Sequence, residues 1–153
     1  MPNFTQSARL IAIETELGED VLLLKSFQMT DAIGRPFVCT CELRSETHDI
    51  KMESVLGGPA TIRIKQTDGK TRYINGIISR FAQEGTPRAK AINKYSCTIV
   101  PALWLLTRTS DCRIFQQMSV TDVIVKVLKE FGVAEVELAA TATYSAREYI
   151  VQY

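Results

Sequence analysis

Hydrophobic and polar residues alternate along much of the first hundred positions of the chain. The clearest case is the stretch 37–43, "FVCTCEL", where every second residue is apolar. One face of such a segment would carry Phe37, Cys39, Cys41 and Leu43. A period of two is typical of a strand with one buried face. We therefore predict a half-buried β-strand at this position.

Further stretches of strand character lie on both sides of it. They are "RLIAIET" at 9–15, "VLLLKSFQM" at 21–29 and "KYSCTIVP" at 94–101. Glycine and proline predict a turn at 31–36, and a short helical turn is expected before Gly57. Pro101 is expected to end the last of these strands, because proline cannot donate to a ladder.

The most specific local pattern surrounds Asp68-Gly69, which separates two apolar, alternating runs. Asp-Gly favours a two-residue hairpin turn, because both of its central positions need positive φ. The sequence therefore predicts a hairpin whose returning strand covers 71–81. Gly76 inside that strand predicts a bulge or a close approach of another backbone.

After Pro101 the apolar period changes from two to between three and four. The stretch 113–133, "RIFQQMSVTDVIVKVLKEFGV", predicts a helix capped by Ser119, with Asp122 completing a capping box. Its apolar stripe is expected to face a core, and Gly132 to end it. This stripe consists of Val120, Val123, Ile124, Val127, Leu128 and Phe131. The final "REYIVQY" again has strand composition. Strands followed by a helix indicate an all-β or α+β fold.

Composition narrows the classes of function. The length of 153 residues and the 46% apolar and 23% charged content are ordinary for one soluble globular domain. A net charge of +1 argues against a dedicated nucleic-acid binder, which usually carries a clear positive excess. The sequence contains no run long and apolar enough for a membrane-spanning helix, and its N-terminus does not resemble a signal peptide.

Candidate chemistry is sparse. His48 is the single histidine and lies in a polar stretch, and no nucleophile motif accompanies it. Cys39, Cys41, Cys97 and Cys112 do not have the paired spacing of a zinc site, and we expect free thiols. No paired carboxylates or phosphate-binding loop are found. We therefore expect neither an enzyme, nor a metal, nor a cofactor, and name no catalytic residues.

Two features keep other interpretations open. Residues 80–113 hold an excess of Lys and Arg, which fits either an acidic partner or a solvated loop rim. Arg108, Asp111, Cys112 and Arg113 follow the only tryptophan, Trp104, and an Arg–Asp ion pair is expected there. A small β-barrel that binds nucleic acid is a second class of function, but most aromatic residues are spaced as core residues. These are Phe37, Tyr73, Phe81 and Tyr95.

In "LWLLTRTSDCRIFQQMSVTDVIVKVLKEFG", residues 103–132, the chain resembles the VgrG family of type VI secretion spike proteins. "GRPFVCTCELRSE", "LGGPATIRI", "RYINGIISRF" and "REYIVQY" are similar to further motifs of that family, in the same order. The resemblance covers residues 22–153. The sequence departs from the family at two places. The "TDAIGR" turn differs from the acidic turn usual in the family, and the loop at 84–93 does not follow the family pattern.

This resemblance implies an α+β, mostly β fold. Barrel-like antiparallel strands would occupy 1–101, a first hub barrel domain. Residues 102–153 would form a helical junction and the truncated start of a following hub domain, anchored by Trp104, Leu105 and Leu106. We expect exposed apolar surface where that domain would sit.

The resemblance also implies a structural role. Three copies would form a ring that caps a hexameric, Hcp-like tube, contacts baseplate components and carries effectors into target cells. The protein would be cytoplasmic before firing and would leave through its own apparatus. A hub of a contractile phage or prophage tail is the close alternative.

Overall fold

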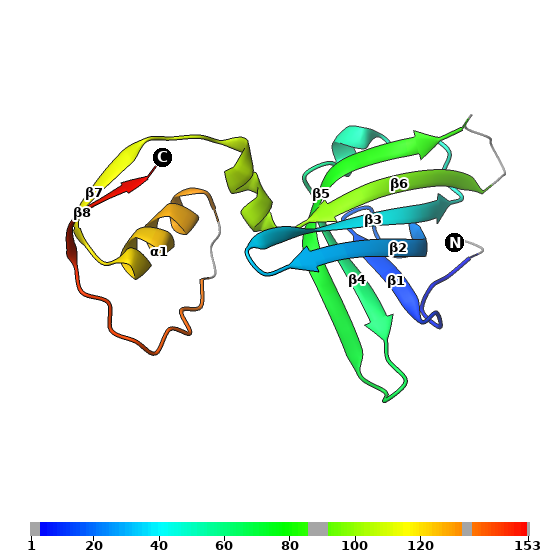
Figure 1. Cartoon of the computed structure of the whole chain (residues 1–153). Helices are drawn as coiled ribbons and strands as arrows, with labels where there is room; N and C mark the ends of the chain where they lie inside the picture. Colours follow the sequence, from blue (N-terminus) through cyan, green and yellow to red (C-terminus); the bar gives the residue numbers. More distant parts are fainter. Residues whose placement is uncertain (1–3, 86–91, 133–135, 153) are drawn as a thin grey trace. The chain divides into compact units, whose positions relative to one another are not determined.

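The computed structural model describes residues 4–85, 92–132 and 136–152 (Figure 1). The chain divides into two compact units, Met1–Pro101 and Ala102–Tyr153, and each is described by itself. The division falls where the hydrophobic period changes, directly after Pro101. Among the described residues, no helix has the length and hydrophobicity needed to cross a bilayer.

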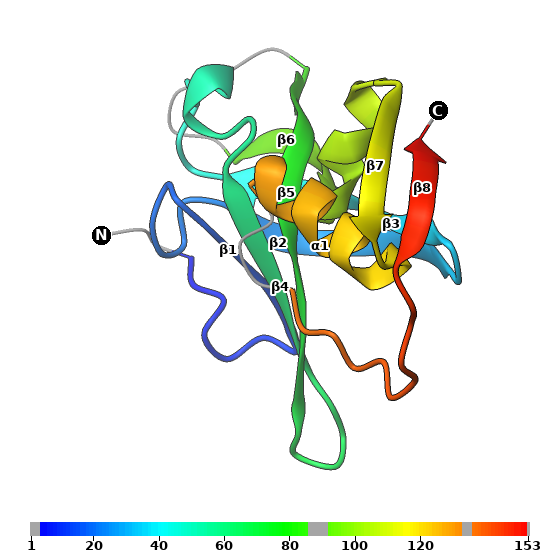
Figure 2. The same ribbon diagram turned by 90° about the vertical axis from the view of Figure 1, so that its left-hand side faces the viewer.

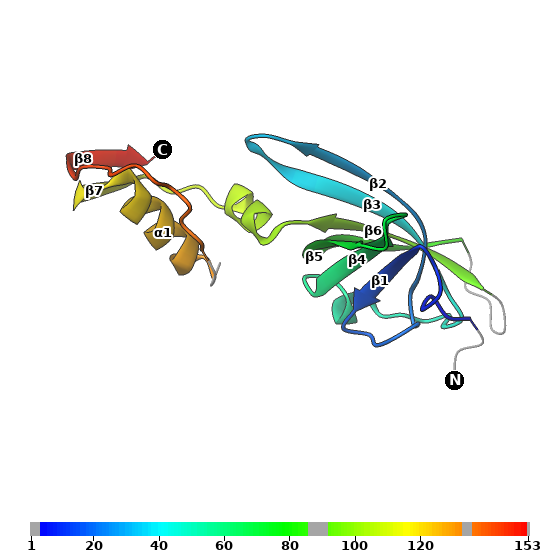
Figure 3. The ribbon, with the colours of Figure 1, turned by 90° about the horizontal axis from the view of Figure 1, so that it is seen from below.

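The first unit is one antiparallel sheet of six strands in the order β1-β4-β5-β6-β3-β2. Its strands, listed in chain order, are β1 (Ile11–Thr15), β2 (Leu23–Ala32), β3 (Arg35–Ser45), β4 (Pro59–Lys65), β5 (Thr71–Glu84) and β6 (Asn93–Val100). A short 3₁₀ helix, η1 (Met52–Ser54), precedes β4. Figure 3 shows the sheet strongly curled, as a half-barrel. The predicted mostly-β α+β fold is confirmed.

The core fills the concave side of this curled sheet. Cys39, Cys41 and Leu43 of β3 are fully buried, whereas Thr40 and Glu42 between them are exposed, as their alternation predicts. The neighbouring strand β6 faces the core with Tyr95, Cys97 and Ile99. The rings of Phe81 and Tyr95 stack with centroids 5.3 Å apart. Apolar burial of this kind is the main force that stabilises a domain of this size.

The predicted hairpin at Asp68-Gly69 forms, but with a longer loop. Lys65 pairs with Thr71, and Gln66 donates its backbone N–H to the carbonyl of Lys70 at 2.8 Å. Three residues therefore lie between the last bonded pair, and only Gly69 among them has positive φ, +81°. This is a type I turn followed by a left-handed glycine, which gives the right twist in a three-residue loop.

Gly76 marks a close backbone approach, one of the two outcomes predicted for it. A Cβ atom there would lie 2.4 Å from the carbonyl oxygen of Val100 and 2.7 Å from Cγ2 of Ile99. Real Cβ contacts are never so short, so β5 can pass this close to β6 only with glycine at this position.

The second unit contains a 3₁₀ helix η2 (Ala102–Arg108), strands β7 (Arg113–Met118) and β8 (Arg147–Gln152), and helix α1 (Val120–Glu130). β7 and β8 form a two-stranded antiparallel sheet, and α1 lies on one face of it (Figure 2). The stretch 113–133 was predicted to be helical with Ser119 as its N-cap, but the residues before that cap, "RIFQQM", form strand β7. These residues pair with β8, which lies far along the sequence, so the pairing overrides the local pattern.

Helix α1 itself begins and ends as predicted. The Ser119 Oγ accepts the backbone N–H of Asp122, and the Asp122 carboxylate accepts the N–H of Ser119, which completes the capping box. Gly132 has φ of +77° and donates to the carbonyl of Lys129. The predicted stripe is only partly covered: no α1 residue is buried, and Val120 and Ile124 are exposed.

Candidate assembly surfaces

The buried thiols are not placed for chemistry. Cys39 and Cys41 have Sγ atoms 3.9 Å apart, and Cys97 lies opposite Cys41 on β6. The hydrogen bond with Cys41 and burial raise the pKa of the Cys39 thiol far above its ordinary value. The bond with Cys39 lowers the pKa of Cys41, but the bond with Cys97 and burial outweigh it and raise that pKa. Both groups stay protonated at neutral pH and act as core residues.

The remaining candidate groups are not assembled into a site. All four cysteines are free, and Cys112 alone is exposed. His48 is also exposed, and its backbone carbonyl accepts a hydrogen bond from the Gln83 side chain at 3.3 Å. Within the described residues, no group of three or more His, Cys, Asp or Glu side chains could hold a metal ion.

The polar corner after Trp104 is organised around Arg113. Its Nε lies 3.2 Å from Oδ2 of Asp111, as predicted, and its Nη1 pairs with Glu130 at the end of α1. The guanidinium also lies over the ring of Phe115, 5.2 Å from the centroid. This arrangement ties the start of β7 to the helix C-terminus and is structural.

The predicted apolar anchor at Trp104 is not buried. No residue of η2 is buried, and Leu105 is exposed. The guanidinium of Arg108 covers the indole of Trp104 at 5.3 Å from its centroid.

An apolar face of the second unit is open instead. Ile114 and Val151 are opposite each other across β7 and β8, and Tyr149 faces Gln116 on the same side. Ile114 and Tyr149 are 67% and 63% exposed, whereas Phe115, on the α1 side of β7, is only 5% exposed. The sheet is therefore packed on one face only. Open apolar faces of this kind mark surfaces that associate with other polypeptide.

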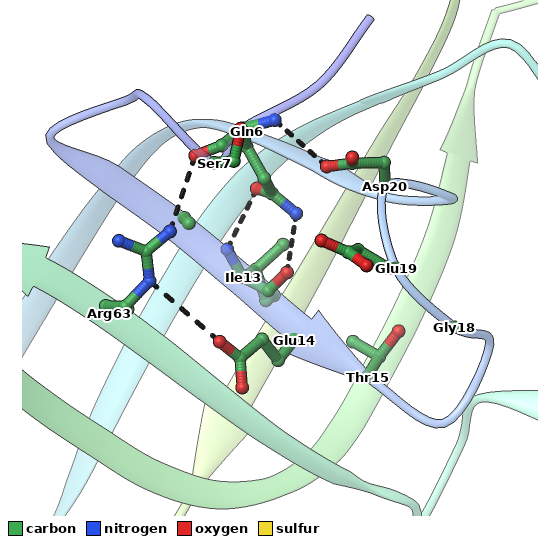
Figure 4. Close-up of a pocket in the computed structure, with 10 residues that line it drawn as sticks. Gln6, Ser7, Ile13, Glu14, Thr15, Gly18, Glu19, Asp20 and Arg63 are labelled. Atoms are coloured by element: carbon green, nitrogen blue, oxygen red, sulfur yellow. Dashed lines mark hydrogen bonds and ion pairs between the residues drawn. The ribbon is translucent and has the colours of Figure 1, made fainter. Parts of the chain in front are cut away.

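The first unit has a second notable surface, the seam between its two edge strands, β1 and β2. The strands contact each other, but no ladder joins them. The side chain of Gln6, which is only 6% exposed, lies between them (Figure 4). Its Oε1 accepts the N–H groups of Ile13 and Leu24, and its Nε2 donates to the carbonyls of Ile13 and Leu22, at 2.7–3.3 Å. One amide thus replaces the missing strand pairing.

The backbone around Gln6 is held from both sides (Figure 4). Its N–H donates to Oδ1 of Asp20 at 2.9 Å, and its carbonyl accepts from Arg63 of β4 at 3.4 Å. Lys65 donates to the carbonyl of Ser7 at 2.8 Å. Residues 4–9, called the N-terminal strap below, therefore cross the outer face of β1, where Ala12 is also buried. A pocket of about 280 Å³ remains beside this crossing.

Comparison with known proteins decides the family. A profile of the phage tail baseplate hub (GPD) family matches residues 30–153. The chain belongs to this family. It is 39% identical to the type VI secretion system spike protein VgrG1b of Pseudomonas aeruginosa over 97% of the chain, and 37% identical to VgrG1c of that organism over 98%. The chain spans about a fifth of the length of these relatives, 20% in each case.

A solved structure shows the same fold. The c3393 protein of E. coli superposes with a TM-score of 0.74 at 21% identity, over 92% of this chain and 38% of that one. It is described as a component of the type VI secretion system, with structural similarity to the T4 bacteriophage tail proteins gp27 and gp5. The resemblance to VgrG proteins seen in the sequence is thus confirmed.

In a hub protein the surfaces matter more than catalytic groups. Several features of these surfaces were not predicted from the sequence. Arg88 and Lys90, part of the predicted basic region, lie outside the described residues. Of the four aromatic residues expected to be core-facing, Tyr73 is 55% exposed. Gln6 was missed entirely, because a single polar residue near the N-terminus carries no periodic signal.

Proposed function

We propose that this chain forms part of the structural hub of a type VI secretion spike. The observation that carries the proposal is its similarity, along 97% of its length, to proteins named as such spikes. The hub-family match across 30–153 supports the same role. The function proposed is mechanical: to join a spike to the tube behind it.

The proposed assembly is a homotrimer. Three copies would form a ring that docks onto a hexameric, Hcp-like tube and contacts baseplate components. The open apolar face at Ile114 and Tyr149 supports association of this kind, because obligate interfaces are large and apolar. Effectors would travel on the completed spike from the cytoplasm into a target cell, through the secretion apparatus itself.

The role we propose is structural rather than catalytic. The raised pKa values of Cys39 and Cys41 support it, because protonated thiols are poor nucleophiles. The variants Cys112→Ala and His48→Ala should leave secretion unchanged. Loss of secretion in either variant, with normal protein levels, would contradict this part of the proposal.

The deciding experiment measures the protein that carries this chain in its own bacterium. Deleting its gene should abolish export of the tube protein, and the purified protein should have the mass of three copies. A strict monomer, even with the tube protein present, would contradict the hub role. If deletion blocks particle assembly after prophage induction and leaves export intact, the phage-tail alternative is correct.

Nucleic-acid binding is the second class to be tested. Tyr73, exposed on β5, is an aromatic residue on the sheet that could support it. Binding of a single-stranded oligonucleotide that weakens steeply with salt would favour that function. We expect no binding even at low salt.

A further inference from the structure

The seam between β1 and β2 is closed at Gln6 and open beyond it. The open part is a groove of about 570 Å³. Its apolar lining comes from both edge strands, from the strap and from Ile92 before β6, and includes Ile11, Leu23, Leu24 and Phe4. A volume of this size accommodates several side chains of a peptide.

The strand edge of β1 faces this groove. Lys65 donates its backbone N–H to the carbonyl of Leu10, so Leu10 and the alternate residues after it bond to β4. Ile11 and Ile13 therefore direct their N–H and C=O groups away from β4, toward the seam. The side chain of Gln6 bonds to the N–H and C=O groups of Ile13. The N–H and C=O groups of Ile11 lie at the groove. An edge of this kind can add a strand from another chain.

The rim of the groove is cationic. Arg9, Lys25 and Arg44 line it. Lys25 pairs with Glu42, but among the described residues no carboxylate lies within ion-pair distance of Arg9 or Arg44. Arg44 donates to the carbonyl of Leu43 at 3.1 Å, and its charge also lowers the pKa of Glu42. An occupant with carboxylates would neutralise these two guanidinium groups.

We propose that this groove binds an extended, acidic segment of another polypeptide, which lies along the edge of β1. Apolar side chains of the segment contact Ile11 and Phe4, neither of which is buried, and alternate carboxylates reach Arg9 and Arg44. The period of two along a strand separates these two sets of side chains. The groove thus recognises a peptide in which acidic and apolar residues alternate. The proposal rests on the lining residues of the groove, all of which belong to the first unit, and does not depend on the hub role.

The experiment titrates the isotopically labelled 153-residue chain with the peptide acetyl-Glu-Val-Glu-Val-Glu-Val-Glu-amide and follows amide signals by NMR. We expect shifts concentrated at Ile11, Leu24 and Lys25. The double variant Arg9→Gln/Arg44→Gln should weaken binding at least tenfold. The matched control is Arg35→Gln/Arg72→Gln, which changes two exposed arginines of the hairpins and should bind like the unchanged chain.

Several outcomes would overturn the proposal. They are no shift at millimolar peptide, equal weakening by the control variant, and equal binding of the peptide in which lysine replaces glutamate. Shifts of the same signals with protein concentration alone would assign the groove to a second copy of the chain. Shifts with an oligonucleotide but not with the peptide would assign it to nucleic acid. In every variant, unchanged signals elsewhere verify the fold.

Discussion

The two units bury their apolar residues to very different extents. In the first unit, strands β1 to β6 enclose a continuous core that includes Leu43, Ile62 and Tyr95. In the second, Phe115 and Ser119 are the only buried residues among those described. Both units have well-formed strands, and α1 has a complete capping box. Regular local structure is therefore not what separates them.

The difference lies in the number of layers that meet. A curled sheet of six strands has an inside, and the strap closes its seam. Two strands and one helix make a single contact face, and the opposite face keeps Ile114 and Tyr149 exposed. Isolated two-stranded sheets are marginal in water, and small units rarely bury enough surface to be stable alone. The first unit therefore has a core of its own, whereas the second leaves one apolar face uncovered.

Separating the units should have the largest effect. We expect residues 1–101 alone to unfold cooperatively and to give a dispersed amide spectrum. Residues 102–153 alone should show neither property, because Phe115 is the one buried apolar side chain among their described residues. Thermal melts by circular dichroism and amide NMR spectra of the two fragments measure this. A cooperative melt of 102–153 would show that its open face needs no partner.

Opening the seam should have the next largest effect. Gln6→Ala removes the partners of four backbone groups, on Ile13, Leu22 and Leu24. Because each buried group left unpaired costs on the order of 1–3 kcal/mol and water can reach some of them, we expect a loss of about 3 kcal/mol in the free energy of unfolding. Denaturant unfolding of the 153-residue chain measures it.

The control for this variant is Gln28→Ala, which changes an exposed glutamine of β2. It should cost a few tenths of a kcal/mol, as exposed substitutions do. Amide exchange of Ile13 and Leu24 should accelerate in the Gln6 variant only. Equal losses in both variants would mean that the amide of Gln6 does not join the edge strands.

The difference between local and long-range contacts explains which features the sequence could predict. The alternation of apolar and polar residues in 37–43 predicts which side chains are buried, because β3 has the core on one face and solvent on the other. The capping box of α1 is equally local, so Ser119 and Asp122 were identified correctly. The division after Pro101 coincides with a change of period that is visible in the sequence.

What the sequence could not predict depends on contacts between distant segments. "RIFQQM" became strand β7 because Phe115 pairs with Ile150, which is 35 positions away, beyond the reach of any local pattern. Gln6 bonds to both Ile13 of β1 and Leu24 of β2, which the curled sheet brings close together. The two surfaces proposed here for association also arise from the three-dimensional fold, since neither corresponds to a motif.

Removing the cap of α1 should have a smaller effect, confined to the second unit. Ser119→Ala leaves the N–H of Asp122 without its side-chain acceptor, and losses of about 1 kcal/mol are typical of such changes. We expect amide exchange in α1 to become about fivefold faster, with the first unit unaffected. The control is Ser110→Ala, an exposed serine before β7. Faster exchange in the first unit would contradict the independence of the two units.

The smallest effect concerns an exposed ion pair on the first unit. Lys25 of β2 donates to Glu42 of β3 at 2.5 Å and holds the pKa of that carboxyl below its ordinary value. A lowered pKa means that the charged form is favoured in the folded chain. The pair therefore stabilises the fold above the ordinary pKa of glutamate, and this contribution disappears as pH falls through the lowered value.

Lys25→Met should return the pKa of Glu42 toward its ordinary range, as followed by carboxyl NMR during a pH titration. Because both side chains are half exposed, high salt should produce much of the same shift in the unchanged chain. If the pKa of Glu42 stays low in Lys25→Met, Arg44 is the cation that holds it, since Arg44 also lowers it. That result would place a carboxylate on Arg44 and reduce the free positive charge at the rim of the β1–β2 groove.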